Sequence, residues 1–403
     1  MFVPGFSISR LPRIEFGSGV VARLPELARH YGRHLLLVTG AASLKSSPAW
    51  PALEQALHEA GLECRTCVIN GEPSPHMIDK AVSEHRDAGI DVVAGIGGGS
   101  VLDAAKAIAG LLRINDTVMD YLEGVGPEKS YAGPAVPFIA VPTTAGTGSE
   151  ATKNAVLSTV GKQGFKKSFR DDQLVAEYAL VDPDFLASCP PALIAADGMD
   201  ALTQLLESYV SLRANPLTDA LAWDGLQAAR DCLLPLYDGT DDQAAARAGM
   251  AYAALLSGIT LAQTGLGSVH GLASPLGAFF PVPHGVVCGT LVGAATQVNI
   301  DAMLEREPDN PALDKYALVA ELFCRQRFTA RETAWEALLR LLNDWTVHLN
   351  LPTLDHYGAT PDDFDHIVAN ARGSSMKTNP IVLSDPEIAR VLALRCSHGG
   401  RVT

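Results

Sequence analysis

Apolar and polar residues alternate with two different periods along the chain, and the change falls near residue 190. Before that point, short apolar runs are separated by stretches of helical spacing, with glycine or proline between them. The apolar runs predict strands at 13–17, 34–39, 63–69, 92–96 and 138–141, and a last strand that ends near 179–183. Helices are predicted at 20–31, 50–60, 78–88 and 103–112. Strands that alternate with helices in this way predict a parallel sheet covered on both faces.

The stretch after Pro190 and Pro191 has the spacing of long helices and shows few strand patterns. The predicted helices are 192–212, 216–235, 242–263, 268–278, 285–304, 311–325, 330–348, 361–371 and 384–395. We therefore expect an α/β domain with a parallel sheet over residues 1–189, followed by an all-α domain over residues 190–403.

Composition and charge limit the possible partners. The 403 residues are 47% hydrophobic and 19% charged, which is typical of a globular protein. A formal net charge of -14 disfavours binding to nucleic acid. We see no apolar run of about eighteen residues and no secretory signal, so we expect no membrane span and a cytoplasmic location. The seven cysteines, including the C-x-x-C pair Cys64 and Cys67, are then expected to be reduced thiols.

A glycine turn follows the predicted strand 92–96. Gly97, Gly98 and Gly99 have no Cβ, so the backbone there can approach a ligand closely. Ser100 then opens a helix, whose first N–H groups and positive dipole end attract phosphate. The spacing matches neither the G-x-G-x-x-G nor the G-x-x-x-x-G-K-[ST] fingerprint. The pattern predicts a phosphate site, and a tight turn that binds nothing stays open as the alternative.

Two more loops rich in glycine and small hydroxyl residues, 39–45 and 142–150, follow other predicted strands. Ligands of an α/β sheet bind beyond the carboxyl ends of its strands, so all three loops are candidates for one phosphorylated ligand. Each loop taken alone is also compatible with an ordinary turn.

The helical part carries polar residues in apolar surroundings. Asp200 and Gln204 are four residues apart on one predicted helix face, and Glu207 lies one turn further on. Two histidines, His270 and His284, stand in other segments. A carboxylate and two imidazoles suit a divalent transition metal, which would polarise an alcohol or carbonyl oxygen. Spacing alone favours ordinary buried residues, because nothing in the sequence shows that these segments converge.

Five motifs in this order, 97–106, 142–150, 197–204, 269–277 and 282–285, resemble those of the iron-containing (group III) alcohol dehydrogenases, which share the dehydroquinate synthase-like fold. The resemblance runs from about Ile14 to about Pro380. It implies a dinucleotide-binding domain, a helical metal and substrate domain, and an active site in the cleft between them.

The resemblance also implies roles for single residues. Gly97, Gly98, Gly99 and Ser100 would bind the pyrophosphate, and Asp103 belongs to the same motif. Thr143, Thr144 and Ser149 would line the nicotinamide side. Asp200, His270 and His284 match three of the family's four metal ligands and would be the catalytic centre.

Two residues depart from the family pattern. Gln204 stands where the family has its second ligand histidine, and an amide oxygen is a poorer donor than imidazole. Ser274 stands where the family has a further histidine near the substrate, so one proton relay is missing. We take the ligand set to be Asp200, Gln204, His270 and His284, with Fe²⁺ or Zn²⁺ as the ion.

The dinucleotide can also be predicted. Members of the family that prefer NAD often place an aspartate after the first long strand, where this chain has Gly40. Glycine does not repel a 2′-phosphate, and Ser43 and Lys45 could bind it. We therefore expect NADP(H) rather than NAD(H), and Gly40, Ser43 and Lys45 join the cofactor-binding candidates.

These observations predict an NAD(P)-dependent alcohol dehydrogenase or aldehyde reductase that acts on a small alcohol and its aldehyde or ketone. Similar proteins form dimers and larger assemblies, so we expect a homo-oligomer, a dimer. One alternative is a maleylacetate reductase-like enzyme that reduces a carboxylated or phosphorylated aldehyde, with Lys167 and Arg170 as anion-binding candidates. Another is a nucleotide-binding protein that has lost its metal.

Overall fold

The computed structural model describes residues 5–41, 44, 47, 49–240 and 242–396. The chain divides into two compact units. The α/β unit comprises Ile8–Thr159 and Lys166–Cys189, and the helical unit comprises Met1–Ser7, Val160–Phe165 and Pro190–Thr403. A parallel α/β sheet followed by helices is the predicted fold class, and the structure confirms it.

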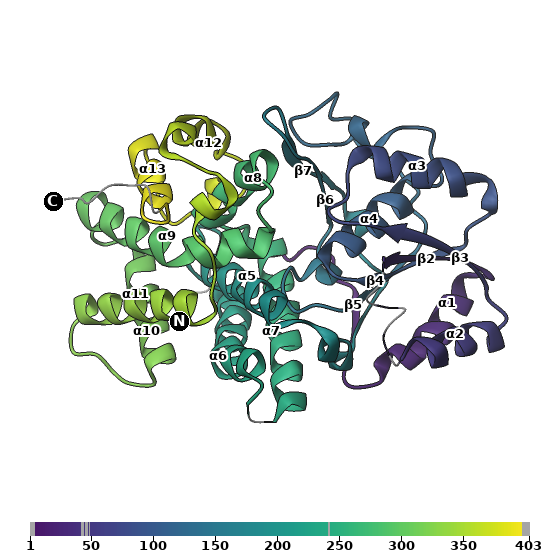
Figure 1. Cartoon of the computed structure of the whole chain (residues 1–403), viewed down its shortest axis with the longest axis horizontal. Helices are drawn as coiled ribbons and strands as arrows, with labels where there is room; N and C mark the ends of the chain where they lie inside the picture. The colour runs from purple at the N-terminus through teal and green to yellow at the C-terminus, as the bar shows by residue number, and fades with distance from the viewer. Residues whose placement is uncertain (1–4, 42–43, 45–46, 48, 241, 397–403) are drawn as a thin grey trace. The chain divides into compact units, whose positions relative to one another are not determined.

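A six-stranded sheet forms the centre of the α/β unit (Figure 1). Its order is β1-β8-β5-β4-β2-β3, and every neighbouring pair is parallel. The strands are β1 (Arg13–Phe16), β2 (His34–Gly40), β3 (Glu63–Ile69), β4 (Val92–Gly97), β5 (Phe138–Pro142) and β8 (Tyr178–Val181). The central strands β2, β4 and β5 are apolar and buried along almost their whole length, as a sheet covered on both faces requires.

Helices cover both faces of this sheet. Helices α1 (Leu24–Tyr31) and α2 (Trp50–Glu59) share a core cluster with Leu35 and Leu37 of β2. Helix α4 (Gly99–Leu111) packs against β4 and β5, and α3 (Pro75–His85) lies beside it (Figure 1). The close approach of α4 depends on Gly95, because a Cβ there would lie 2.8 Å from the Cβ of Ala105.

Two local features differ from the sequence prediction. The helix after the glycines begins at Gly99, four residues before the predicted start at 103, because Gly98 is extended and serves as the N-cap. Strands β6 (Asn154–Thr159) and β7 (Phe165–Arg170) form a separate two-stranded sheet that the prediction lacks. Both strands are short, and β7 carries Lys166, Lys167 and Arg170, so neither has the apolar run of the central strands.

A buried acid and a buried base lie where the loop after β5 meets α4. Lys106 of α4 has 0% exposure, and its Nζ donates to the carbonyl of Asn154 (2.7 Å) and to Thr152 Oγ1 (2.9 Å). Burial raises the pKa of Glu150 to about 7, although the charge of Lys106 acts in the opposite direction. The folded state therefore holds the proton of Glu150 at pH values where the unfolded chain has released it.

This proton makes stability depend on pH. Because the folded-state pKa of Glu150 is raised, the free energy of unfolding falls as pH rises from the ordinary glutamate pKa toward about 7. Glu150→Gln removes that loss. We expect the free energy of unfolding of the variant, relative to that of the wild type, to rise by about 2 kcal/mol between about pH 5.5 and pH 8. Chemical denaturation at the two pH values measures it, and an equal difference at both would contradict the assignment.

Over the described residues, the helical unit begins with seven long helices and ends with two shorter ones (Figure 1). They are α5 (Pro191–Val210), α6 (Pro216–Asp238), α7 (Gln243–Thr264), α8 (Ser268–Phe279), α9 (His284–Arg306), α10 (Pro311–Cys324), α11 (Arg331–His348), α12 (Phe364–Asn370) and α13 (Asp385–Ala393). Helix α5 packs against α6, α7 and α9. Helices α7 and α9 are long and apolar enough to cross a membrane, but 61% and 89% of their most apolar windows are buried inside the protein. This burial is expected of helices in the core of a folded unit.

Candidate metal and dinucleotide sites

The three loops singled out in the sequence leave the sheet at one edge. Strand β4 lies between β2 and β5, with Ile96 paired to Thr39 and Gly97 paired to Pro142. The N–H of Thr143 donates to the carbonyl of Gly97 (3.0 Å). The loops after these three strands therefore start side by side at the carboxyl edge, where α/β sheets bind their ligands.

The glycine turn packs directly against the loop after β5. A Cβ on Gly98 would lie 3.2 Å from the side chain of Thr144, and a Cβ on Gly99 would lie 2.7 Å from that of Thr147. The N–H groups in the first turn of an α-helix have no partner within the helix. The start of α4 thus offers donors beside a bare backbone, as a pyrophosphate requires.

The other dinucleotide candidates fall into three groups. Gly40 is the last residue of β2, while Ser43 and Lys45 lie outside the described residues. The Ser149 hydroxyl donates to Asp103 Oδ1 (2.5 Å), and Asp103 Oδ2 accepts from the N–H of Val156 (3.1 Å). Asp103 and Ser149 therefore brace the loop after β5 against α4.

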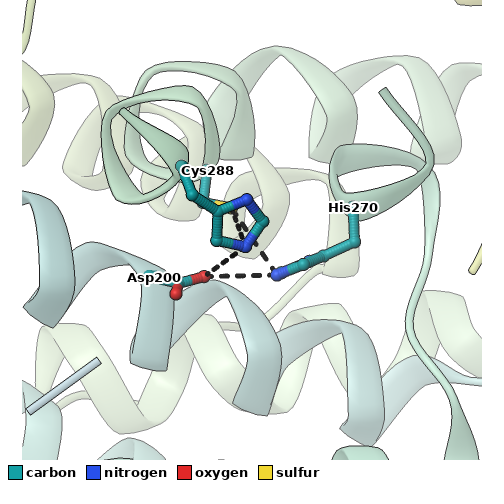
Figure 2. Close-up of side chains that lie close together, drawn as sticks. Asp200, His270 and Cys288 are labelled. Atoms are coloured by element: carbon teal, nitrogen blue, oxygen red, sulfur yellow. Dashed lines mark hydrogen bonds and ion pairs between the residues drawn. The ribbon is translucent and has the colours of Figure 1, made fainter. Parts of the chain in front are cut away.

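Four possible metal ligands converge in the helical unit. Asp200 comes from α5, His270 from α8, and both His284 and Cys288 from α9. Figure 2 shows Asp200, His270 and Cys288 close together. Asp200 Oδ1 lies 3.2 Å from His270 Nε2 and 3.8 Å from His284 Nε2. Cys288 Sγ lies 3.5 Å and 3.8 Å from the same two nitrogens. One carboxylate, two imidazoles and a thiol within 4.8 Å of one another suit a divalent transition metal.

Glu207 orients one of the histidines. Its Oε2 accepts from His270 Nδ1 (2.6 Å), and its Oε1 accepts from the N–H of Val269 (2.7 Å). An ionised carboxylate only accepts, so Nδ1 carries a proton, and the other ring nitrogen, Nε2, faces Asp200 Oδ1, where a metal ion could take the place of its proton. Metal-binding histidines are commonly held by such a carboxylate.

The electrostatics of the group depend on burial. Burial alone would lower the pKa of His270, but the neighbouring groups Cys288, Glu207 and Asp200 together raise it well above its ordinary value. Burial and the charge of Asp200 raise the pKa of the Cys288 thiol to about 12. A dication among these atoms would offset the negative charge of Asp200 and would favour a thiolate on Cys288.

Glu207→Gln tests whether Glu207 supports the metal site. The new amide can accept one of the two hydrogen bonds, but its NH₂ group would then face the other donor. Zinc affinity, measured by competition with a chelator, should fall about 10- to 100-fold. Glu387→Gln, which changes a carboxylate at the start of α13, is the matched control and should leave the affinity unchanged. Wild-type affinity in Glu207→Gln would contradict this role.

The two residues that depart from the family pattern, Gln204 and Ser274, lie on α5 and α8. The Oε1 atom of Gln204, the fourth predicted ligand, accepts a hydrogen bond from Ser257 Oγ on α7 (2.6 Å). Ser274 lies on α8, one turn after His270. The sequence reasoning missed Cys288, although it lies four residues after His284 and so on the same face of α9.

Comparisons with known proteins find similar chains over almost the whole length of this one. The family model "Iron-containing alcohol dehydrogenase" matches residues 12–183, and "Fe-containing alcohol dehydrogenase family, C-terminal" matches residues 194–395. Alcohol dehydrogenase 4 of Saccharomyces cerevisiae (strain YJM789) is 30% identical over 395 residues, which are 97% of this chain and 98% of the yeast protein. The 4-hydroxybutyrate dehydrogenase of Cupriavidus necator is 32% identical over 393 residues, or 95% and 97% of the two chains. The crystal structure of a 1,3-propanediol oxidoreductase matches with a TM-score of 0.87 and 28% identity, and covers 97% of this chain and 100% of its own.

Proposed function

This chain belongs to the iron-containing alcohol dehydrogenase family, whose members related to it are alcohol and aldehyde oxidoreductases, and from that premise we propose a metal-assisted, nicotinamide-dependent interconversion of a small alcohol and its aldehyde or ketone. The observation that carries the proposal is the convergence of Asp200, His270 and His284 from three separate helices. A buried carboxylate beside two imidazoles is a donor set that suits a divalent transition metal.

Each unit has its own part in this reaction. In the helical unit, Asp200, His270 and His284 would hold a divalent ion, which supplies Lewis-acid polarisation of the substrate oxygen. Glu207 keeps His270 in the tautomer that can bind metal. In the α/β unit, Gly97–Ser100 would bind the pyrophosphate, with Thr143 and Thr144 beside it, so that the nicotinamide can exchange hydride.

The preference between the two nicotinamide dinucleotides is a finer proposal. We propose NADP(H), because Gly40 at the end of β2 presents no carboxylate to a 2′-phosphate. Comparing kcat/KM for NADPH and NADH at one saturating aldehyde concentration tests it. A higher value with NADH would contradict it and would leave the rest of the proposal intact.

A second candidate is reduction of an aldehyde that carries a carboxylate. The similarity to a 4-hydroxybutyrate dehydrogenase favours it. Lys167 and Arg170 are the cations that would bind this carboxylate. Both lie on β7, and Arg170 already pairs with Glu123 (3.3 Å). We therefore keep the uncharged substrate as the first proposal.

Aldehyde-dependent oxidation of NADPH and NADH by zinc- or iron-loaded protein tests the function. The panel should pair uncharged aldehydes of two to four carbons with their ω-carboxylated counterparts. We expect turnover with the uncharged series. Higher kcat/KM with the carboxylated series would select the second candidate, and no turnover with either series would overturn both.

A cytoplasmic location and a homodimer stay predictions from the sequence. Light scattering coupled to gel filtration measures the assembly. A mass of twice 42.5 kDa would agree with the dimer.

A further inference from the structure

We propose that Cys288 is the fourth protein ligand of this metal site, as a thiolate, and that it replaces the imidazole that is missing at position 204. The inference rests on the metal-assisted function proposed above. The family's histidine stands at the position of Gln204, which lies on α5, whereas the sulfur reaches the site from α9. Four observations support it.

Four of the six distances between the candidate ligand atoms are close to those around a tetrahedral ion, and all four atoms lie within 4.8 Å of one another. Zinc binds imidazole nitrogen and carboxylate oxygen at about 2.0–2.2 Å and thiolate sulfur at about 2.3 Å, so ligand atoms at the corners of a tetrahedron lie about 3.3–3.8 Å apart. Cys288 Sγ lies 3.5 Å from His270 Nε2 and 3.8 Å from His284 Nε2. Asp200 Oδ1 lies 3.2 Å and 3.8 Å from the same two nitrogens. The sulfur therefore stands where a fourth corner is needed.

Gln204 is engaged elsewhere. Its side chain is 3% exposed, and its Oε1 accepts from Ser257 Oγ on α7 (2.6 Å). The atom that would bind a metal thus has a partner of its own. An amide is also a weaker donor than a thiolate for a transition metal.

The backbone brings the sulfur to the site. Gly285 and Gly289 each follow a ligand of α9, and both face α5. A Cβ on Gly285 would lie 2.5 Å from the carbonyl oxygen of Ala196, and a Cβ on Gly289 would lie 2.7 Å from the Cβ of Met199. Helix α9 can therefore approach α5 closely, and Figure 2 shows Cys288 facing the side chains of Asp200 and His270.

The sulfur is buried among the other candidate ligands. Cys288 has 0% exposure, and the contacts described for its Sγ are with the two histidines and Asp200. On binding, the Sγ–H bond is replaced by a sulfur–metal bond and the proton passes to the buffer. A thiolate beside imidazoles and a carboxylate is a donor set typical of zinc.

Cobalt(II) provides a direct test, because a thiolate ligand gives Co²⁺ an intense near-ultraviolet charge-transfer band that carboxylate and imidazole do not. Metal-free protein should bind one equivalent of Co²⁺ and show this band. Cys288→Ser should lose the band and weaken Co²⁺ binding by at least about 100-fold, more than the loss of a residue that only supports a ligand. Cys396→Ser, which changes another buried cysteine of the helical unit, should keep both.

Two further variants keep the test decisive if Cys288→Ser binds no metal. The double variant Cys288→Ser/Gln204→His should regain Co²⁺ without the band, and Gln204→Leu should keep both the metal and the band. A wild-type Co²⁺ complex without the band, or a band that persists in Cys288→Ser, would overturn the proposal. Wild-type protein that binds no Co²⁺ would overturn it as well. The proposed function is judged separately, by aldehyde turnover, because a site without thiolate can still be active.

Discussion

Asp200→Asn should lower kcat/KM for aldehyde reduction by on the order of 10³-fold, or about 4 kcal/mol of transition-state stabilisation. Asp200 is 1% exposed, and its Oδ1 lies 3.2 Å from His270 Nε2 and 3.8 Å from His284 Nε2, so it is the proposed charged ligand of the site. The amide keeps the shape of the side chain but removes the negative charge that offsets a dication in a buried site. Steady-state kinetics and elemental analysis of the same preparations measure the effect.

The control for this change is Asp301→Asn. Asp301 lies on the exposed side of α9 and pairs with Arg390 (2.7 Å), so the same substitution there should leave metal content and turnover unchanged. If Asp200→Asn kept its metal and more than about a tenth of the wild-type kcat/KM, the carboxylate would not be a ligand that matters for the reaction.

Gly99→Ala should weaken dinucleotide binding by about 5- to 150-fold. A Cβ at this position would lie 2.7 Å from the side chain of Thr147, so the loop after β5 must move away from the start of α4. Overpacking of this kind costs about 1–3 kcal/mol, and the bound state is the one that needs the tight arrangement. Titration of NADPH fluorescence against the protein measures the dissociation constant.

Gly373→Ala is the matched control, because a Cβ there meets nothing within 4 Å. It should leave the dissociation constant unchanged. Shortening the Thr147 side chain removes the atoms that the new Cβ would meet. The double variant Gly99→Ala/Thr147→Ala should therefore regain part of the dinucleotide affinity. Wild-type affinity in Gly99→Ala alone would show that the dinucleotide does not depend on this turn.

The sheet could be predicted because its central strands are continuous apolar runs. Strands β2, β4 and β5 are buried on both faces, so their sequences differ sharply from the loops around them. Strands β6 and β7 were missed because partly exposed strands need no apolar run. The early start of α4 was missed because glycines are poor helix formers, and the close packing that requires Gly97, Gly98 and Gly99 is visible only in three dimensions.

The site could be predicted only in part. Asp200 and His270 are 70 residues apart in the chain, and no local pattern shows that α5 and α8 bring them together. Their residue types alone suit a metal, and the family resemblance implied that Asp200, His270 and His284 meet and that position 204 is a ligand position. Cys288 lies outside the motifs that carry the resemblance. The i, i+4 spacing from His284 was its one signal, and such a spacing is common among buried helix residues.

The most direct test of a metal-assisted oxidoreductase is a titration of metal-free protein with Zn²⁺ or Fe²⁺, followed by NADPH- and NADH-dependent reduction of short aldehydes. The account predicts that turnover rises in proportion to the bound ion, reaches its maximum at one equivalent and disappears with a chelator. Turnover that is the same with and without metal, or absent at every loading, would contradict it.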